Sequence, residues 1–179
     1  MRWEDIDEQI ATKVRGQQFA CRRGCAWCCH QLIVLTHWDD GRQILDAARE
    51  RMTAEEFEAF VERLRAQSRE IHELGHEAAE ARRWTCPLLK EGECVVYDVR
   101  PVACRSVFSP DADTCRAMME TDDFDTLTPE QQATATAIGE RAFSLQIAVN
   151  DQRPVDGPVE LRELLVRLID AGDYRRPSG

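Results

Sequence analysis

The sequence predicts a mainly α-helical protein: a single helical domain over residues 1–179 with an irregular, metal-held, cysteine-rich centre. Apolar residues recur at intervals of three or four in several long segments, which is the spacing of one face of an α-helix. The middle of the chain lacks this spacing and is interrupted by proline and glycine. The sequence shows no alternation of strands with helices and no internal repeat, which argues against a parallel α/β sheet.

The beginning of the chain is predicted to form a short helix. Ile6, Ile10 and Val14 recur every four residues, so a helix is expected over residues 5–19. After a cluster of cysteines, the apolar stretch QLIVL at residues 31–35 predicts a brief strand or extended segment.

Two further helices are predicted, each after a threonine that can cap it. Thr36 with Asp39 resembles a capping box and predicts a helix over residues 37–51. Thr53 begins a second helix in the same way, and this helix is predicted to run without a break to Arg83. The apolar residues of the second helix fall on roughly one face: Phe57, Phe60, Val61, Leu64, Ile71 and Leu74.

The segment from Trp84 to Pro110 is predicted to be irregular. Proline and glycine interrupt it at four positions: Pro87, Gly92, Pro101 and Pro110. Within this segment, Pro101 suits the first turn of a short helix that carries Cys104. This part of the chain is therefore expected to be ordered largely by metal ligation rather than by helix packing.

The C-terminal helices are predicted over about residues 129–172. The first begins at Pro129 and ends near Val149. The second lies within residues 157–172 and is closed by Gly172. The tail YRRPSG is expected to be loose.

Composition narrows the classes of function. The formal net charge of −10 argues against nucleic acid as the main partner, because phosphate binding needs a basic face. No apolar run approaches the ~20 residues of a membrane span, and acids occupy the start of the chain where a secretory signal has a basic stretch. The protein is therefore expected to be cytoplasmic, where thiols stay reduced. Eight cysteines in that setting favour metal or redox chemistry over a disulfide framework.

The cysteines fall into groups that suit a site with several thiolates. Four lie within nine positions: Cys21, Cys25, Cys28 and Cys29. The other four are Cys86, Cys94, Cys104 and Cys115. A Cys-x2-Cys loop lets two sulfurs reach one ion, and distant segments then close the coordination sphere. Adjacent Cys28 and Cys29 cannot easily take neighbouring corners of one tetrahedron, so either they serve two metals or one of them does not ligate.

The arginines beside the cysteines suggest a second feature of such a site. Arg22, Arg105 and Arg116 each follow a cysteine, and Arg23 is one position further on. Neighbouring guanidinium groups stabilise thiolate, the form that binds metal. They would also offset the negative charge of a cluster of thiolates.

The ordered pattern C-x3-C-x2-CC followed by CPLL-x2-G-x-C-x2-Y-x2-RP-x2-CR resembles the zinc- or iron-chelating domain of the CxxCxxCC cysteine-cluster family. The resemblance covers Cys21 to Arg105. It also includes Gly92, Tyr97, Arg100 and Pro101. It implies a metal site built from seven residues: Cys21, Cys25, Cys28, Cys29, Cys86, Cys94 and Cys104. Cys115 lies outside the matched part, and the cysteine-cluster region as a whole spans about residues 21–115.

The identity of the metal is left open by the residues. Thiolate suits zinc and iron alike, and zinc would give a closed structural site in a protein that acts through its surface. The spacing of Cys21, Cys25 and Cys28 also matches the cluster loop of radical S-adenosylmethionine enzymes, although the repeated βα units of those enzymes are missing. This spacing, with the surplus of thiols beyond one four-thiolate site, favours an iron–sulfur cluster. It leaves open whether the protein has a redox, sensor or interaction role. A metal-free redox switch that uses the pair Cys28 and Cys29 is a further alternative.

The string HELGH at residues 72–76 predicts a rival function. On one helix it would place His72 and His76 on one face, with Glu73 as the general base of a zinc metalloprotease. Glu80 is a possible third ligand. The surrounding acids and arginines are more typical of a solvated helix face. His30 and His37 are further possible metal ligands near the cysteines.

Overall fold

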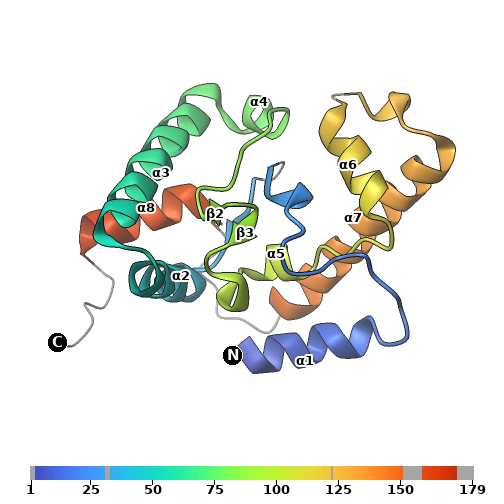
Figure 1. Ribbon diagram of the computed structural model, residues 1–179, viewed down its shortest axis with the longest axis horizontal. Helices are drawn as coiled ribbons and strands as arrows, with labels where there is room; N and C mark the ends of the chain where they lie inside the picture. Colours follow the sequence, from blue (N-terminus) through green and yellow to red (C-terminus); the bar gives the residue numbers. More distant parts are fainter. Residues whose placement is uncertain (1–2, 31–32, 122, 151–158, 173–179) are drawn as a thin grey trace. The chain divides into compact units, whose positions relative to one another are not determined.

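The computed structural model describes residues 3–30, 33–121, 123–150 and 159–172 (Figure 1). The predicted mainly α-helical fold is confirmed, because helices account for most of the regular structure. The chain divides into two compact units, and the predicted single domain stays a prediction. Unit 1 contains Met1–Cys28 and Val102–Val155, and unit 2 contains Cys29–Pro101 and Asp156–Gly179. Within the described ranges, none of the helices combines the length and the apolar character needed to cross a membrane.

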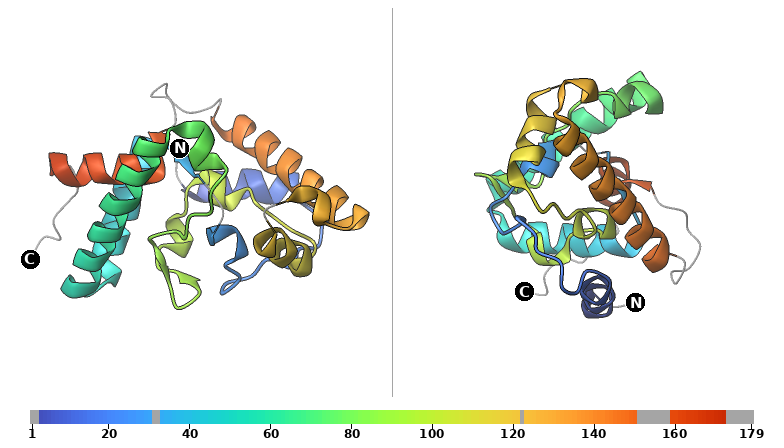
Figure 2. Two further views of the ribbon diagram at one scale, coloured as in Figure 1. Left: turned by 90° about the horizontal axis from the view of Figure 1, so that it is seen from above. Right: turned by 90° about the vertical axis from the view of Figure 1, so that its right-hand side faces the viewer.

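The described residues of unit 1 include four α-helices and a short 3-10 turn. The helices are α1 (Trp3–Lys13), α5 (Val102–Arg105), α6 (Ala112–Glu120) and α7 (Pro129–Asn150), and the turn is η3 (Phe124–Thr126). Helix α7 packs against α1, α5 and α6, and Figure 2 shows α6 running beside it. The core of this unit joins α1, α5 and α7 through five buried residues: Ile6, Ile10, Val102, Leu145 and Val149.

Helix α1 is shorter than its apolar spacing predicts. It ends at Lys13, whereas the expected helix continued to Phe19. A turn follows, in which the Gln17 N–H donates to the Val14 carbonyl at 3.1 Å. Gly16 has a φ of +80°, a conformation that glycine adopts without the steric penalty of a Cβ atom. The turn therefore ends the helix and begins the irregular segment that carries Cys21.

Helix α6 carries Cys115 and was not predicted from the sequence. It lies between the segment predicted to be irregular, which ends at Pro110, and the helix predicted from Pro129. The Asp111 carboxylate caps it and accepts hydrogen bonds from the backbone N–H groups of Asp113 and Thr114, both at 3.0 Å. The helix has only nine residues, so periodicity alone gave little signal for it. Helix α7, in contrast, confirms the helix predicted from Pro129 to about Val149.

Unit 2 combines helices with two small antiparallel strand pairs. Its helices are α2 (Trp38–Arg51), α3 (Ala54–Leu74), α4 (His76–Glu80) and α8 (Leu161–Ala171), with a 3-10 turn η2 (Tyr97–Val99). Strand β1 (Leu35–Thr36) pairs with β4 (Val159–Glu160), and β2 (Leu89–Lys90) pairs with β3 (Glu93–Cys94). Helix α8 packs against α2 and α3 (Figure 1). These helices supply most of the buried core of the unit: Ile44, Leu45, Phe60, Leu64, Leu164, Leu165 and Leu168.

Of the two helix N-caps predicted in unit 2, one is confirmed and the other is wrong. Thr53 and Glu56 form the full capping box at the start of α3, as predicted. The box predicted from Thr36 and Asp39 is wrong, because His37 is the N-cap of α2 and makes no side-chain cap hydrogen bond. The Thr36 hydroxyl instead donates to the buried Asp40 carboxylate at 3.4 Å.

The last helix confirms its predicted end but begins later than expected. Helix α8 starts at Leu161, where the Glu160 carboxylate accepts hydrogen bonds from the N–H groups of Arg162 and Glu163. Gly172 closes the helix with a φ of +64°, as its position predicts. The first residues of the expected helix, 157–158, and the tail YRRPSG lie outside the described residues.

Two helical glycines are expected to respond in opposite directions to a larger side chain. A Cβ atom at Gly41 would lie 2.9 Å from side-chain atoms of both Leu164 and Leu168, which are buried. Gly41→Val should therefore cost about 1–3 kcal/mol through overpacking. A Cβ atom at Gly139 meets nothing within 4 Å, so Gly139→Ala should gain about 0.5–1 kcal/mol from helix propensity. Urea unfolding of both variants measures the two changes, and equal effects would contradict this packing.

Candidate metal centre

All eight cysteines lie within the described residues, and they form no disulfide with one another. Unit 1 contains Cys21, Cys25, Cys28, Cys104 and Cys115. Unit 2 contains Cys29, Cys86 and Cys94. Cys21 is exposed and the other seven are partly buried. This degree of exposure differs from that of cysteines used as small core residues, which are usually fully buried.

Cys21 and Cys25 lie on an irregular loop of unit 1 that hydrogen bonds tie to a second loop at Ser109, and Cys28 follows in the 3-10 turn η1 (Trp27–His30). The Ala20 N–H donates to the Ser109 carbonyl at 2.8 Å, and the Ser109 N–H donates to the sulfur of Cys21 at 3.2 Å. The chain then turns, and the Cys25 N–H donates to the Arg22 carbonyl at 2.9 Å. A backbone N–H directed at a cysteine sulfur favours its thiolate form. The loop thus holds Cys21 in a setting suited to a ligand.

Cys115 lies close to this loop, although the sequence pattern left it outside the ligand set. Burial raises the pKa of the Cys115 thiol, a hydrogen bond with the Ser109 side chain lowers it, and the nearby thiols of Cys21, Cys25 and Cys28 raise it further. The net direction is upward. The thiols of Cys21, Cys25 and Cys28 are therefore close enough to Cys115 to act on it electrostatically.

The cysteines of unit 2 lie on a loop and a two-residue hairpin. The Cys86 N–H donates to the Cys29 carbonyl at 2.7 Å, so these two residues are neighbours through the backbone. Cys94 is on β3, where it pairs with Leu89 of β2. Glu91 and Gly92 form the connection with positive φ values of 50° and 79°, which is the geometry of a tight hairpin turn. Gly92 therefore has a structural role in placing Cys94.

The two histidines near the cysteines are arranged differently from metal ligands. The Nδ1 atom of His30 lies 3.1 Å from the Thr85 hydroxyl, so its ring is hydrogen-bonded beside Cys86. His37 occupies the N-cap position of α2. Neither belongs to a group of ligands that converges on one point among the residues that the structure describes.

Arg51 of α2 is close enough to Cys94 for the two side chains to interact electrostatically. Arg51, at the end of α2, donates to the Val95 carbonyl at 3.1 Å and to the Asp98 carboxylate at 2.8 Å. The Asp98 hydrogen bond raises the pKa of Arg51, and the neighbouring Cys94 adds to this electrostatically. Two arginines that follow cysteines in sequence bind carboxylates instead. Arg105 pairs with Asp7, and Arg116 pairs with Asp113 and Glu120.

The described side chains do not form a closed metal site. Across residues 3–30, 33–121, 123–150 and 159–172, no three Cys, His, Asp or Glu side chains converge closely enough to hold a metal ion. The donor chemistry fits zinc or iron, because thiolate is a preferred ligand of both. Ligation would require the sulfurs to move closer together. The predicted metal-held centre therefore stays a prediction, as does its set of seven ligands.

The metalloprotease alternative rested on a continuous helix through HELGH, and that expectation is wrong. Helix α3 ends at Leu74, and α4 begins at His76. Between them Gly75 has φ +75° and ψ 163°, an extended left-handed conformation that breaks the helix. An H-E-x-x-H zinc site needs both histidines on one helical face. The backbone at Gly75 removes that geometry.

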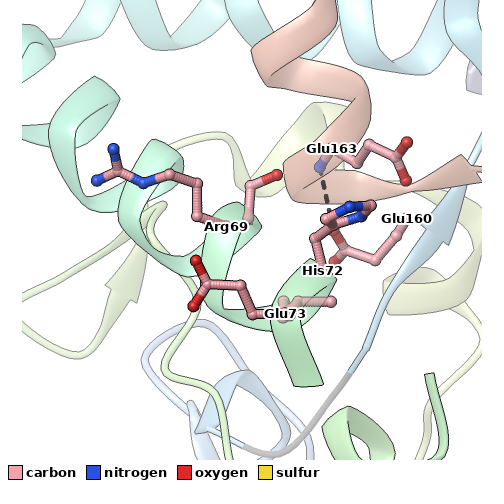
Figure 3. Close-up of a pocket in the computed structure, with 7 residues that line it drawn as sticks. Arg69, His72, Glu73, Glu160 and Glu163 are labelled. Carbon is pink, nitrogen blue, oxygen red and sulfur yellow. Dashed lines mark hydrogen bonds between the residues drawn. The ribbon is translucent and has the colours of Figure 1, made fainter. Parts of the chain in front are cut away.

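A surface cavity does lie beside this string, as Figure 3 shows. It has a volume of about 250 Å³ and is lined by His72, Glu73, Glu160 and Glu163 together with residues of α3. The Glu160 carboxylate already accepts hydrogen bonds from Arg162 and from the Glu163 N–H, which the dashed line in the figure marks. These interactions use Glu160 to cap α8. The cavity therefore lies where Glu160 caps α8, and its side chains form no catalytic arrangement.

Replacing His72 is expected to leave metal content unchanged. His72 and Glu73 are exposed, so His72→Ala should change the free energy of unfolding by no more than about 0.5 kcal/mol. Metal analysis of the purified variant, with Glu73→Gln as a matched control from the same turn, tests this. Loss of one equivalent of zinc in His72→Ala alone would restore the metalloprotease interpretation.

A comparison with family models identifies the cysteine-rich part of the chain. The model of the CxxCxxCC family, described as a putative zinc- or iron-chelating domain, matches residues 20–131. The match covers more than half of the chain and encloses all eight cysteines. The chain belongs to the CxxCxxCC family. Its family region extends past Arg105, the end expected from the pattern, and so includes Cys115 and helix α6. No curated protein and no solved structure matches this CxxCxxCC chain.

The residues of the CxxCxxCC pattern other than cysteine have structural roles in this chain. Arg100 stacks on the Tyr97 ring, with 3.6 Å between the guanidinium carbon and the ring centroid, and donates to the Tyr97 carbonyl at 2.8 Å. Arg105 is buried and forms an ion pair with Asp7 of α1. Gly92 forms the hairpin turn. These residues position the segments that carry Cys94 and Cys104.

Proposed function

We propose that this CxxCxxCC-family protein binds zinc or iron through clustered cysteine thiolates. The observation that carries the proposal is the family match, which encloses all eight cysteines in a domain described as zinc- or iron-chelating. The proposed ligands are the seven that the sequence pattern contains: Cys21, Cys25, Cys28, Cys29, Cys86, Cys94 and Cys104. All of them are at least partly accessible, as metal entry requires.

Local interactions within each unit support thiolate chemistry at these positions. In unit 1, the Ser109 N–H donates to the Cys21 sulfur. In unit 2, the Arg51 guanidinium lies near Cys94 and is held there by Asp98. A hydrogen-bond donor and a neighbouring cation both lower the cost of forming a thiolate.

We favour iron–sulfur binding over zinc for two reasons. The ligand set holds more thiols than one closed four-thiolate zinc site uses. The spacing of Cys21, Cys25 and Cys28 also suits a loop that wraps three corners of a cluster. An iron–sulfur cluster would supply one-electron redox chemistry, whereas zinc would hold the fold without redox change. A redox or sensor role follows from an iron–sulfur cluster, whereas an interaction role follows from zinc.

Purification under anaerobic conditions, followed by elemental analysis and a visible absorption spectrum, tests the proposal. Iron with acid-labile sulfide and a broad visible absorption is the expected result. Zinc without visible colour would keep the thiolate site and overturn the preference for iron–sulfur. A protein that contains no metal and takes up neither zinc nor iron would overturn the proposed function itself.

A further inference from the structure

We infer that Gln67 of α3 is a positioning residue for Cys86 and holds the backbone of this proposed ligand in place in the metal-free chain. The inference rests on the proposed thiolate function and deepens it, because it assigns a residue outside the cysteine pattern to the support of one ligand. Gln67, Cys86 and the residues that connect them all belong to unit 2.

The backbone around Cys86 is held by hydrogen bonds to other parts of the unit. The Cys86 N–H donates to the Cys29 carbonyl at 2.7 Å, and the Cys86 carbonyl accepts from the Leu89 N–H at 3.0 Å. One residue earlier, the Thr85 carbonyl accepts from the side-chain amide of Gln67 at 2.9 Å. Contacts within the protein itself therefore place Cys86, and Gln67 supplies the one that comes from a long helix.

Helix α3 also contacts this segment one turn before Gln67. The Arg63 guanidinium donates to the Pro87 carbonyl at 3.5 Å, which is the longer of the two contacts. At the start of the segment, Trp84 is 5% exposed and its ring N–H donates to the Ala79 carbonyl at 2.8 Å. The segment is thus anchored at both ends, and Gln67 makes the short contact closest to the cysteine.

Arg162 of α8 fixes which way the Gln67 amide faces. The Nε atom of Arg162 donates to Oε1 of Gln67 at 2.7 Å. A guanidinium has donors and no acceptor, so it can face only the oxygen of the amide. The amide NH₂ group is then left to face the Thr85 carbonyl. An arginine from another helix therefore selects the amide orientation that the Cys86 segment needs.

Arg162 is itself held firmly. It is 1% exposed, and its guanidinium donates to the Glu160 carboxylate at 2.7 Å. Glu160 caps α8 beside the cavity of Figure 3. Separating a buried arginine from its partners is costly, so the guanidinium has little freedom to release Gln67. Both residues lie beyond residue 131, where the family match ends. A helix outside the family domain thus supports a proposed ligand inside it.

Gln67→Glu separates the two hydrogen bonds of this side chain. Glutamate has the same shape and keeps an oxygen for Arg162, so the packing of α3 on α8 is retained. Its second oxygen replaces the NH₂ group and repels the Thr85 carbonyl. Gln43→Glu is the matched control, because Gln43 is exposed on α2 of the same unit and donates to the Asp39 carbonyl at 3.4 Å. It adds the same charge and loses a similar hydrogen bond away from Cys86.

The test uses the full chain, reduced and free of metal. Hydrogen exchange read by mass spectrometry over residues 84–89, and labelling of Cys86 by a thiol reagent, should both become about 5-fold faster in Gln67→Glu. This is the change in local opening that one net hydrogen bond supplies. Labelling of Cys94, in the same unit, should keep its wild-type rate. On titration with Co²⁺, Gln67→Glu should bind about 10-fold more weakly, as expected when the support of a ligand is removed.

Urea unfolding distinguishes positioning from a purely structural role. Gln67→Glu should unfold at the same urea concentration as Gln43→Glu, whereas Gln67→Met loses both hydrogen bonds and should unfold at a lower one. A midpoint in Gln67→Glu as low as that of Gln67→Met would overturn the inference, as would exchange and labelling equal to those of Gln43→Glu. A wild-type chain that takes up no cobalt, zinc or iron would overturn the proposed function, while faster labelling of Cys86 in metal-free Gln67→Glu would still support the positioning role.

Discussion

Removal of the metal is expected to lower the melting temperature by about 8–16 °C. A ligand that binds only the folded state contributes about 4 kcal/mol when its free concentration is about 1,000 times Kd, and each kcal/mol shifts melting by about 2–4 °C in a chain of this size. The loss should be large because the cysteine loops contain little else that orders them. Residues 17–26, for example, contain no regular secondary structure.

Differential scanning fluorimetry with and without a chelator measures this change, and a thiol reagent counts the cysteines that become reactive. Buffer exchange without chelator is the control. Re-addition of the metal should restore both melting temperature and thiol protection. A stripped protein with unchanged melting and protease resistance would show that the metal, if bound, is peripheral to the fold.

Serine in place of Cys25, Cys86 or Cys104 is expected to lower metal affinity at least about 10-fold, since even changes outside the ligands themselves cost that much. These three cysteines come from separate segments: the first loop, the loop before β2, and helix α5. Each segment should be needed, because a thiolate site is closed by contributions from several parts of the chain.

Elemental analysis of the three variants under one purification protocol provides the measurement. Ala103→Ser, beside Cys104 on α5 and equally partly buried, is the matched control for an added hydroxyl. It should retain wild-type metal content. Full occupancy in Cys86→Ser would show that the seven-residue ligand set is wrongly assigned.

The sequence predicted those parts of the fold that depend on local signals. Thr53 with Glu56 predicted the start of α3, and Gly172 predicted the end of α8, because capping chemistry involves only neighbouring residues. The break at Gly75 was missed because one glycine inside a periodic pattern does not decide between a tolerated helical position and a kink. Its positive φ becomes visible only in the folded chain.

For the candidate site too, the sequence revealed the order of the cysteines but not the contacts between distant segments. The order of the cysteines predicted the family, and the family model confirmed it. The sequence could not show that the Ser109 N–H donates to the Cys21 sulfur, 88 residues away, or that Arg51 lies near Cys94. Both contacts depend on how distant segments pack. One signal for α6 was present, namely Asp111 three positions before Thr114.

The division of unit 1 between the two ends of the chain has a consequence for its synthesis on the ribosome. Helix α1 buries Ile6 and Ile10 against Leu145 and Val149 of α7, and more than 100 residues separate the two helices. At a translation rate of ~5–20 residues per second, synthesis of α7 begins roughly 6–23 s after α1 is complete. During that interval the apolar face of α1 cannot be buried against α7, so the core of unit 1 is completed only late in synthesis.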